Sequence, residues 1–312
     1  MNKNQPDLIR EIDSPVFNRA FYWYVVTLFR RRFRAVWLDD SAVRHTSRAT
    51  LYLGNHNSWW DALIPLLLNE RVLHQRAKAM MDVEQLQKYP FFRRLGVFSI
   101  DRRHPRKAFE SLVYAAELLN ESGMHPDPKV PGSHAGAGAP SPSPAPAPAS
   151  ASSASSSAAP SVSISTGAGA VSSSSRSAPV LDRKAMPRNT RPVGLWFYPE
   201  GKLVRPETPV TLEGGIKWLA RNLDPARTEI VPFAIHMHFM RSDKPELFVR
   251  MGEVLDQRMF EMRGDPVRDE TQADRIAMIM RHLRDATRRD SAQFNESGRP
   301  HSGFRLLLGR QP

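Results

Sequence analysis

Short apolar runs of strand length alternate with helical patterns along the chain. The apolar runs occupy residues 50–53, 97–100, 193–198, 229–235 and 247–251. One helical pattern begins after His56 and runs to Leu68. The others cover residues 105–123, 215–223 and 273–286. The pattern at 105–123 has proline near its start and glycine past its end, as helices often do. Strands that alternate with helices predict an α/β domain.

A long segment poor in large side chains interrupts this pattern. Residues 125–189 are mostly alanine, serine, proline and glycine, and no aromatic residue occurs between Tyr114 and Trp196. Such a segment buries too little apolar surface to offset the entropy cost of ordering it, so we predict a disordered insertion. It either separates two domains or interrupts one. The motifs described below favour one domain, formed by residues 46–124 and 190–290 and followed by a C-terminal tail at 291–312.

Aromatic and basic residues are mixed in the N-terminal segment, residues 1–45. The stretch FNRAFYWYVVTLFRRRFRAVWL, residues 17–38, is too polar to span a bilayer. It suits a helix lying in the membrane interface, with aromatic rings at the level of the lipid headgroups and arginines on phosphates. The alternative is a helix packed on the protein core with a solvated basic face.

Composition narrows the classes of partner and of chemistry. The formal net charge of +12 points to an anionic partner, either nucleic acid or an anionic membrane surface. No recognised nucleic-acid motif accompanies the basic cluster Arg30 to Arg34, so we expect the membrane and no nucleic acid. The chain has no cysteine, which excludes disulfides, thiolate zinc sites and cysteine nucleophiles. The first residues lack the apolar stretch of a secretory signal, which favours the cytoplasmic face of the cell membrane, with the protein peripheral or monotopic.

The candidate chemistry begins at His56, which stands at the end of a predicted strand with Asp61 close behind it. Two residues five apart on a continuous helix point about 140° apart, so a direct contact needs His56 outside the helix and Asp61 in its first turn. Ser58 is a plausible N-cap that starts the helix there. Asp61 can then hold one imidazole nitrogen while the other acts as a base for a substrate hydroxyl.

Two alternatives compete with this interpretation. Ser58 and Asp61 also have the spacing of a capping box, in which Asp61 only completes a helix N-terminus. Ser58 as a covalent nucleophile is disfavoured, because no Gly-x-Ser-x-Gly elbow surrounds it. A further pair, His236 and His238, places two imidazoles on one strand face, but no third ligand is evident nearby and no metal site is predicted.

Three more segments join His56 and Asp61 in a fixed order. They are Gly96 to Arg102, Tyr198-Pro199-Glu200-Gly201 and Val231-Pro232. With these four motifs the chain resembles the glycerolipid acyltransferases, which include the lysophosphatidate acyltransferases. Lys78 and the stretch from Tyr89 to Phe92 also look like the spacer of that family. The resemblance covers residues 35–125 and 190–255.

The resemblance implies a fold and a set of roles. The fold is a mixed, mainly parallel central sheet flanked by helices, like that of glycerol-3-phosphate acyltransferase. His56 is the general base and Asp61 orients it. The implied substrate-binding residues are Arg102 at the acceptor phosphate or headgroup, Glu200 and Gly201 at the acceptor, and Pro232 on the acyl-donor side. A planar guanidinium at a strand end suits bidentate phosphate binding, which agrees with the role of Arg102.

The third motif departs from the family pattern. The family usually continues with Thr-Arg-Ser after the glycine, whereas Leu203 stands here in place of the arginine. Lys202 or Arg205 could supply the positive charge instead, and we include Arg205 among the substrate-binding candidates. This departure bears on the acceptor and leaves His56 and Asp61 unaffected.

The predicted function is therefore fatty-acyl transfer from acyl-CoA or acyl-carrier protein to a lysophospholipid hydroxyl, as in 1-acylglycerol-3-phosphate. No metal or tightly bound cofactor is needed, and the acyl carrier is a co-substrate. One alternative keeps the reaction and changes the acceptor to a glycolipid, an aminolipid or a carotenoid glycoside. An alternative of another class is a non-catalytic module that binds anionic membranes.

Overall fold

A computed structural model describes residues 8–122, 182–212, 214–239, 242–256, 266–295, 298–300 and 303–309, with the backbone alone at 266–274. The chain divides into two compact units. One contains residues 1–125 and 180–312, and the other contains residues 126–179. The second unit lies outside the described residues, and so does most of the predicted insertion.

The first unit is organised around an eight-stranded sheet with the order β4-β3-β5-β2-β6-β7-β1-β8. All neighbouring strands are parallel except the pairs β6/β7 and β1/β8. The strands are β1 (Ala35–Asp39), β2 (Ala49–Gly54), β3 (Arg76–Asp82), β4 (Val97–Ile100), β5 (Val193–Phe197), β6 (Thr228–His238), β7 (Glu246–Met251) and β8 (Arg305–Gly309). The predicted α/β class with a mixed, mainly parallel sheet is confirmed.

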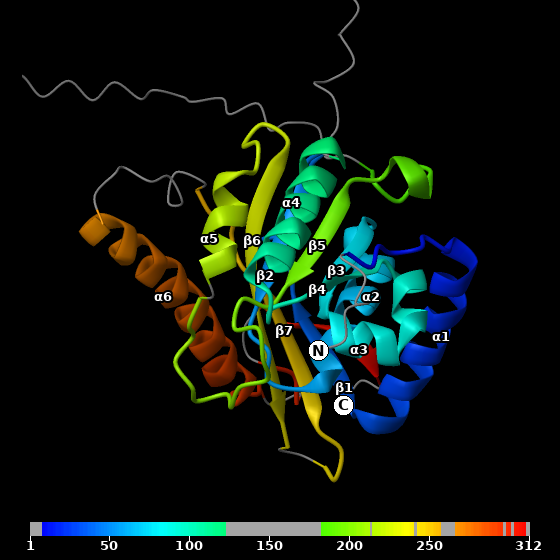
Figure 1. Cartoon of the computed structure of the whole chain (residues 1–312). Coiled ribbons are helices and arrows are strands. Elements are labelled where there is room, and N and C mark those ends of the chain that lie inside the picture. Colours follow the sequence, from blue (N-terminus) through cyan, green and yellow to red (C-terminus); the bar gives the residue numbers. More distant parts are fainter. Residues whose placement is uncertain are drawn as a thin grey trace, which may run out of the picture. The chain divides into compact units, whose positions relative to one another are not determined.

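Helices cover both faces of this sheet (Figure 1). The α-helices are α1 (Pro15–Arg32), α2 (Ile64–Leu68), α3 (Val83–Lys88), α4 (Pro105–Ser122), α5 (Gly214–Arg221) and α6 (Pro266–Ser291). Short turns of other helix types are η1 (Trp59–Leu63), η2 (Asn69–Leu73), η3 (Pro90–Leu95) and η4 (Arg188–Thr190). One buried cluster joins α1 and α2 to the sheet, and another joins α4, α5 and α6 to its opposite face. Because both faces are covered, the central strand β2 is buried along its whole length.

Strands from both sides of the insertion lie in this one sheet. β5, which follows the insertion, lies between β3 and β2, which precede it. Parallel strands need a crossover connection, and α4 lies in the connection that runs from β4 to β5. The insertion therefore follows α4, at the end of a crossover.

The N-terminal helix is shorter than the sequence pattern indicated. Residues 17–38 were expected to form one interfacial helix, but α1 ends at Arg32 and the next residues form the buried strand β1. β1 pairs with β7 and β8, so its backbone hydrogen bonds are made within the sheet. The run Ala35 to Leu38 is wholly buried, which a helix on the membrane surface would not allow. Residues 8–45 are thus part of the α/β unit.

One face of α1 packs on the core. Tyr22, Val25, Val26 and Phe29 recur at the spacing of one helix face and are buried. Val16 and Trp23, seven residues apart, are exposed. The expected alternative was a core-packed helix with a solvated basic face. Its core-packed side is present in α1, while the exposed side also carries the apolar residues Val16 and Trp23. None of the helices in the described part of the chain is both long and apolar enough to cross a membrane.

The predicted insertion and the predicted C-terminal tail both contain residues that belong to the α/β unit. Arg183, expected within the disordered insertion, is buried and donates hydrogen bonds to the carbonyl groups of Thr46 and Leu73. Residues 182–189 therefore belong to the α/β unit. The expected tail at 291–312 contains β8, which pairs with β1 and forms one edge of the sheet. Both segments are ordered by contacts with residues distant in sequence, which a local pattern does not contain.

Candidate active site

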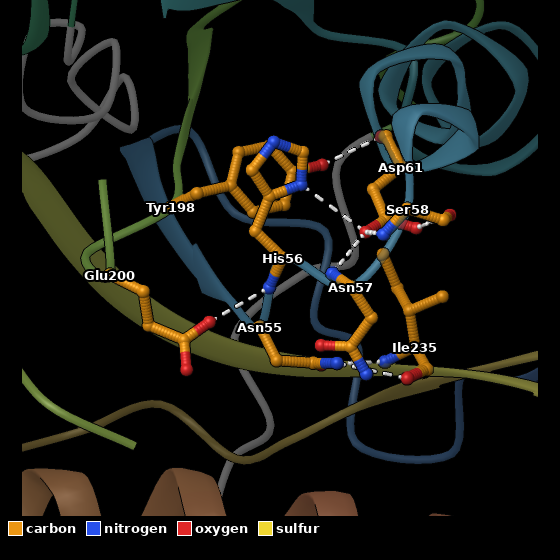
Figure 2. Close-up of polar contacts among 8 residues, drawn as sticks. All are labelled: Asn55, His56, Asn57, Ser58, Asp61, Tyr198, Glu200 and Ile235. Carbon is orange, nitrogen blue, oxygen red and sulfur yellow. Dashed lines mark hydrogen bonds and ion pairs between the residues drawn. The ribbon is translucent and has the colours of Figure 1, made fainter. Parts of the chain in front are cut away.

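The predicted pair lies at the carboxyl end of β2. His56 follows the strand directly and stays outside the helix, while Asp61 lies in the first turn of η1 with Ser58 as its N-cap. The Nδ1 atom of His56 is 3.2 Å from Oδ2 of Asp61 (Figure 2). Because an ionised carboxylate only accepts hydrogen bonds, this contact requires the proton on Nδ1. Within the described residues, Nε2 has no hydrogen-bond partner.

Asp61 is fully buried and accepts several hydrogen bonds. Its Oδ2 accepts the backbone N–H groups of Asn57 at 2.7 Å and Ser58 at 2.8 Å, and its Oδ1 accepts the Ser58 hydroxyl at 2.8 Å. Hydrogen bonds of this kind stabilise the charged carboxylate. Asp61 therefore completes the start of η1 and contacts His56 at the same time, so the two interpretations of the sequence describe one arrangement.

The backbone of His56 is fixed from two sides. Its N–H donates to Oε2 of Glu200 at 3.0 Å, and its carbonyl accepts the N–H of Val204 at 2.9 Å. The preceding residue, Asn55, makes two side-chain hydrogen bonds with the backbone of Ile235 on β6 (Figure 2). The segment after β5 and the strand β6 thus hold His56 in place, although both are distant from it in sequence.

Tyr198 touches both members of the pair. Its ring stacks on the His56 imidazole, with centroids 4.4 Å apart and planes inclined by 24°. Its hydroxyl donates to the backbone carbonyl of Asp61 at 2.7 Å. Burial, followed by the nearby charge of Asp61, raises the pKa of Tyr198 well above its usual value, so the hydroxyl keeps its proton.

Glu200 is buried and lies behind His56 rather than on the cavity surface. Its exposed fraction is 2%, and its Oε1 atom has no hydrogen-bond partner among the described residues. Burial raises the pKa of Glu200, while the His56 N–H and the charge of Arg284 oppose that shift. Glu200 therefore holds the backbone of His56 in place by accepting its N–H.

His56 opens onto a cavity of about 1060 Å³. Most of the lining is apolar and comes from η1, β3, η3, α4, the end of β5 and the segment after it, including Trp59, Met80, Phe92, Leu112 and Phe197. Two basic side chains, Arg102 and Lys202, also line it, together with Asp82, whose Oδ2 lies 3.9 Å from Nε of Arg102. A mostly apolar cavity with a few convergent polar groups is the usual form of a small-molecule site.

A second, smaller cavity of about 340 Å³ lies beside the first. It is lined only by apolar and aromatic residues, and Trp59, Phe91 and Phe92 also line the large cavity. The remaining residues of the small cavity are Phe17, Phe21, Tyr24 and Leu63. α1 therefore contributes directly to the surroundings of the site.

The substrate-binding candidates fall into two groups. Arg102 and Gly201 line the large cavity, and Gly201 adopts a positive φ of 63° that favours glycine at this turn. Arg205 and Pro232 are not among the lining residues. Arg205 is exposed, and Pro232 is buried in β6, where its carbonyl accepts the N–H of Gly252 at 2.7 Å. Lys202 and Arg205 were the two cations proposed to replace the missing arginine, and of these two Lys202 lines the cavity.

Sequence reasoning gave no role to Tyr198 or Asn55. Asn55 stands directly before His56, and Tyr198 stands two residues before Glu200. For Asn55, the available signal was a polar side chain directly beside the candidate base. The partners of these side chains come from other elements, so their contacts could not be read from spacing.

The described residues contain no group of three or more histidine, aspartate or glutamate side chains that could hold a metal ion. The rings of His236 and His238 have their centroids 5.5 Å apart. Burial, together with the charges of His238 and Arg288, lowers the pKa of His236 to about 4.

The geometry therefore describes a buried carboxylate, an oriented imidazole and an apolar cavity. No family model and no curated protein matches this chain.

Proposed function

We propose that the protein is an acyltransferase that moves a fatty-acyl group from a thioester carrier to a lipid hydroxyl, with His56 as general base. The observation that carries the proposal is the His56–Asp61 contact of 3.2 Å at the wall of a large, mostly apolar cavity. The proposed fold is that of the glycerolipid acyltransferases, which the order of the four sequence motifs supports.

The proposed reaction needs one base and no covalent intermediate. The acceptor hydroxyl loses its proton to Nε2 of His56 as its oxygen attacks the thioester carbonyl carbon. Asp61 stabilises the imidazolium that forms. The tetrahedral intermediate then collapses, the C–S bond breaks, and the proton on His56 passes to the leaving thiolate. The products are an ester and the free thiol of coenzyme A or acyl-carrier protein.

The cavity suits a substrate that combines a hydrocarbon chain with an anionic group. Its apolar side chains can bury methylene groups, each of which contributes about 0.8 kcal/mol. Arg102 and Lys202 on the same lining can bind a phosphate. These two cations support a lysophospholipid acceptor such as 1-acylglycerol-3-phosphate. Glycolipid, aminolipid and carotenoid glycoside acceptors remain the alternative, since Leu203 replaces the arginine of the family motif.

An anionic membrane surface is the proposed partner, with the protein peripheral or monotopic on the cytoplasmic face. Several exposed aromatic residues surround the two cavities, namely Tyr24, Trp59, Tyr89 and Phe91. Basic side chains lie among them, with Lys88 over the ring of Tyr89 and Arg94 over that of Phe17. Aromatic rings and cations at one surface are typical of a membrane interface, where both groups are favourable.

The test is an acyl-transfer assay with the purified full chain. Radiolabelled palmitoyl-CoA and palmitoyl-acyl-carrier protein are each offered with lysophosphatidate, a glycolipid and an aminolipid in mixed micelles. We expect transfer to at least one acceptor, and its loss in His56→Ala. The matched control is His104→Ala, since His104 contacts Asp101 at 2.7 Å but does not line the cavity.

Transfer assays and vesicle cosedimentation of the same two proteins together separate catalysis from simple membrane binding. The proposed reaction is wrong if His56→Ala and the wild type transfer equally. Equal vesicle binding by both proteins, with no transfer by either, would instead favour the non-catalytic membrane-binding module.

A further inference from the structure

Tyr198 stands apart from the other residues around His56 because a single side chain contacts both members of the pair. It follows β5 directly, at the carboxyl end of the strand beside β2. Figure 2 shows its ring lying over the imidazole and its hydroxyl directed at Asp61. The arrangement links Tyr198, His56 and Asp61 by three pairwise contacts.

The ring and the hydroxyl restrict different motions. At 4.4 Å between centroids, the phenol ring covers one face of the imidazole and blocks its rotation about the Cβ–Cγ bond. The hydroxyl bond of 2.7 Å fixes the backbone of Asp61, whose carboxylate holds Nδ1. A half-turn of the imidazole would put the Cδ2 atom in the place of Nδ1, so the bond to Asp61 would be lost, and it would also move Nε2 to the position of Cε1.

Tyr198 is itself supported from behind. The ring of Phe233 on β6 lies edge-on to it, with centroids 5.9 Å apart and planes inclined by 71°. Phe233 also packs edge-on against Trp196, and its exposed fraction is 1%. This packing limits the rotamers of Tyr198, so the position of its ring is set by the core of the sheet.

We propose that Tyr198 is a positioning residue that keeps the His56 imidazole with Nδ1–H on Asp61 and Nε2 toward the cavity. The inference rests on the proposed function, in which Nε2 must accept the proton of the acceptor hydroxyl. The ring supplies the orientation of the imidazole, and the hydroxyl fixes the carboxylate that defines its tautomer.

The test compares Tyr198→Phe and Tyr198→Leu with a matched control, Tyr52→Phe. Tyr52 also stacks on an aromatic ring, that of Trp196 at 4.3 Å, and its hydroxyl also makes a 2.7 Å bond, to Gln75. It lies on β2 before the site and does not line the cavity. Each control and variant is assayed at the same folded fraction, measured by circular dichroism.

We expect Tyr198→Phe to lower kcat about 3- to 10-fold with KM unchanged, because one buried hydrogen bond is lost and the stacked ring remains. Tyr198→Leu should lower kcat about 100-fold or more, since the imidazole loses its stacking partner as well. Tyr52→Phe should leave kcat within about 2-fold, whatever its effect on the melting temperature.

A second readout does not depend on turnover. Long-range ¹H–¹⁵N NMR, with the His56 signal assigned by its absence in His56→Ala, reports which imidazole nitrogen carries the proton. We expect one Nδ1–H tautomer in the wild type and a mixture in Tyr198→Leu. An unchanged kcat and an unchanged tautomer in Tyr198→Leu would overturn the proposed role. If the wild type showed no acyl transfer, the proposed function would fail, while the tautomer measurement would still decide the role of Tyr198.

Discussion

Oδ2 of Asp61 lies 3.2 Å from Nδ1 of His56, and the same oxygen accepts the backbone N–H groups that open η1. The helix start and the orientation of the imidazole therefore depend on one buried carboxylate. Capping η1 does not require a contact with an imidazole, so the contact of Asp61 with His56 at the cavity wall is an additional feature. Because this oxygen is shared, a substitution of Asp61 should affect both the local stability of this turn and the proposed chemistry. A substitution of His56 should affect the chemistry alone.

The first prediction uses this asymmetry. Asp61→Asn should lower kcat about 10³- to 10⁴-fold, because an amide cannot stabilise an imidazolium and can hold the wrong tautomer. It should also lower the free energy of unfolding by about 1–3 kcal/mol, since its NH₂ group faces backbone donors. His56→Gln should abolish transfer while leaving the unfolding free energy nearly unchanged. Steady-state kinetics and urea denaturation test both variants, and equal stability losses in the two would contradict this division.

The second prediction concerns Gly54, which precedes Asn55 and His56. A Cβ atom at this position would overlap the ring of Phe233, which is buried and cannot move freely. Gly54→Ala should therefore destabilise the protein by about 1–3 kcal/mol and lower kcat, because Phe233 supports Tyr198. Combining it with Phe233→Leu should recover at least about 1 kcal/mol relative to additivity.

The control for this prediction is Gly214→Ala at the start of α5, where an added Cβ meets nothing within 4 Å. Denaturation should show little change or a small gain in stability for that variant. A Gly54→Ala protein as stable as the Gly214→Ala protein would be inconsistent with the packing described.

The third prediction separates the cations of the site. Arg102→Met and Lys202→Met should each lower kcat/KM for an anionic acceptor about 5- to 20-fold, a moderate value because both side chains are exposed. Arg205→Met should have less than about a 2-fold effect, since Arg205 does not line the cavity. A neutral acceptor, assayed in parallel, should respond to none of the three changes. A large effect of Arg205→Met alone would reverse the assignment.

The fourth prediction follows from His236. Burial lowers its folded-state pKa to about 4, below the usual value of about 6.5 for a histidine, so the unfolded chain takes up a proton that the folded protein excludes. Stability should therefore be complete above about pH 6.5 and should fall by up to about 3 kcal/mol as the pH drops toward 4. His236→Gln should remove this part of the acid sensitivity. Urea midpoints measured between pH 4 and pH 7 would show parallel curves for the two proteins if the argument is wrong.

The fifth prediction tests the membrane partner without altering either cavity. Val16 and Trp23 lie on one exposed face of α1 and line neither cavity. Val16→Ser/Trp23→Ser should reduce cosedimentation with phosphatidylglycerol vesicles about 10-fold or more, because it removes apolar groups from the interface. Val254→Ser/Met278→Ser removes two other exposed apolar side chains and should bind like the wild type. Binding of the Val16→Ser/Trp23→Ser protein equal to that of the wild type would exclude this face of α1 as the contact.

The relation between sequence and structure differs between the two ends of the chain. The run Ala35 to Leu38 was expected to continue a helix, and Arg305 to Gly309 to lie in a tail, yet both are strands that pair with each other. Each run is short and apolar, which suits a helix end or a strand equally well. Only the neighbouring strand supplies hydrogen-bond partners for the backbone, and that neighbour lies far away in the sequence.

The sequence by itself determined the α/β class and the local form of the site. The alternation of apolar runs with helical patterns requires a sheet with covered faces. The spacing of His56, Ser58 and Asp61 permits their contact only at a helix start. That contact depends on the backbone conformation of a few neighbouring residues, which the local sequence determines. The tertiary structure decided which distant groups complete the site. Tyr198 and Glu200 reach His56 only because β5 lies beside β2, a pairing set by the packing of the whole sheet.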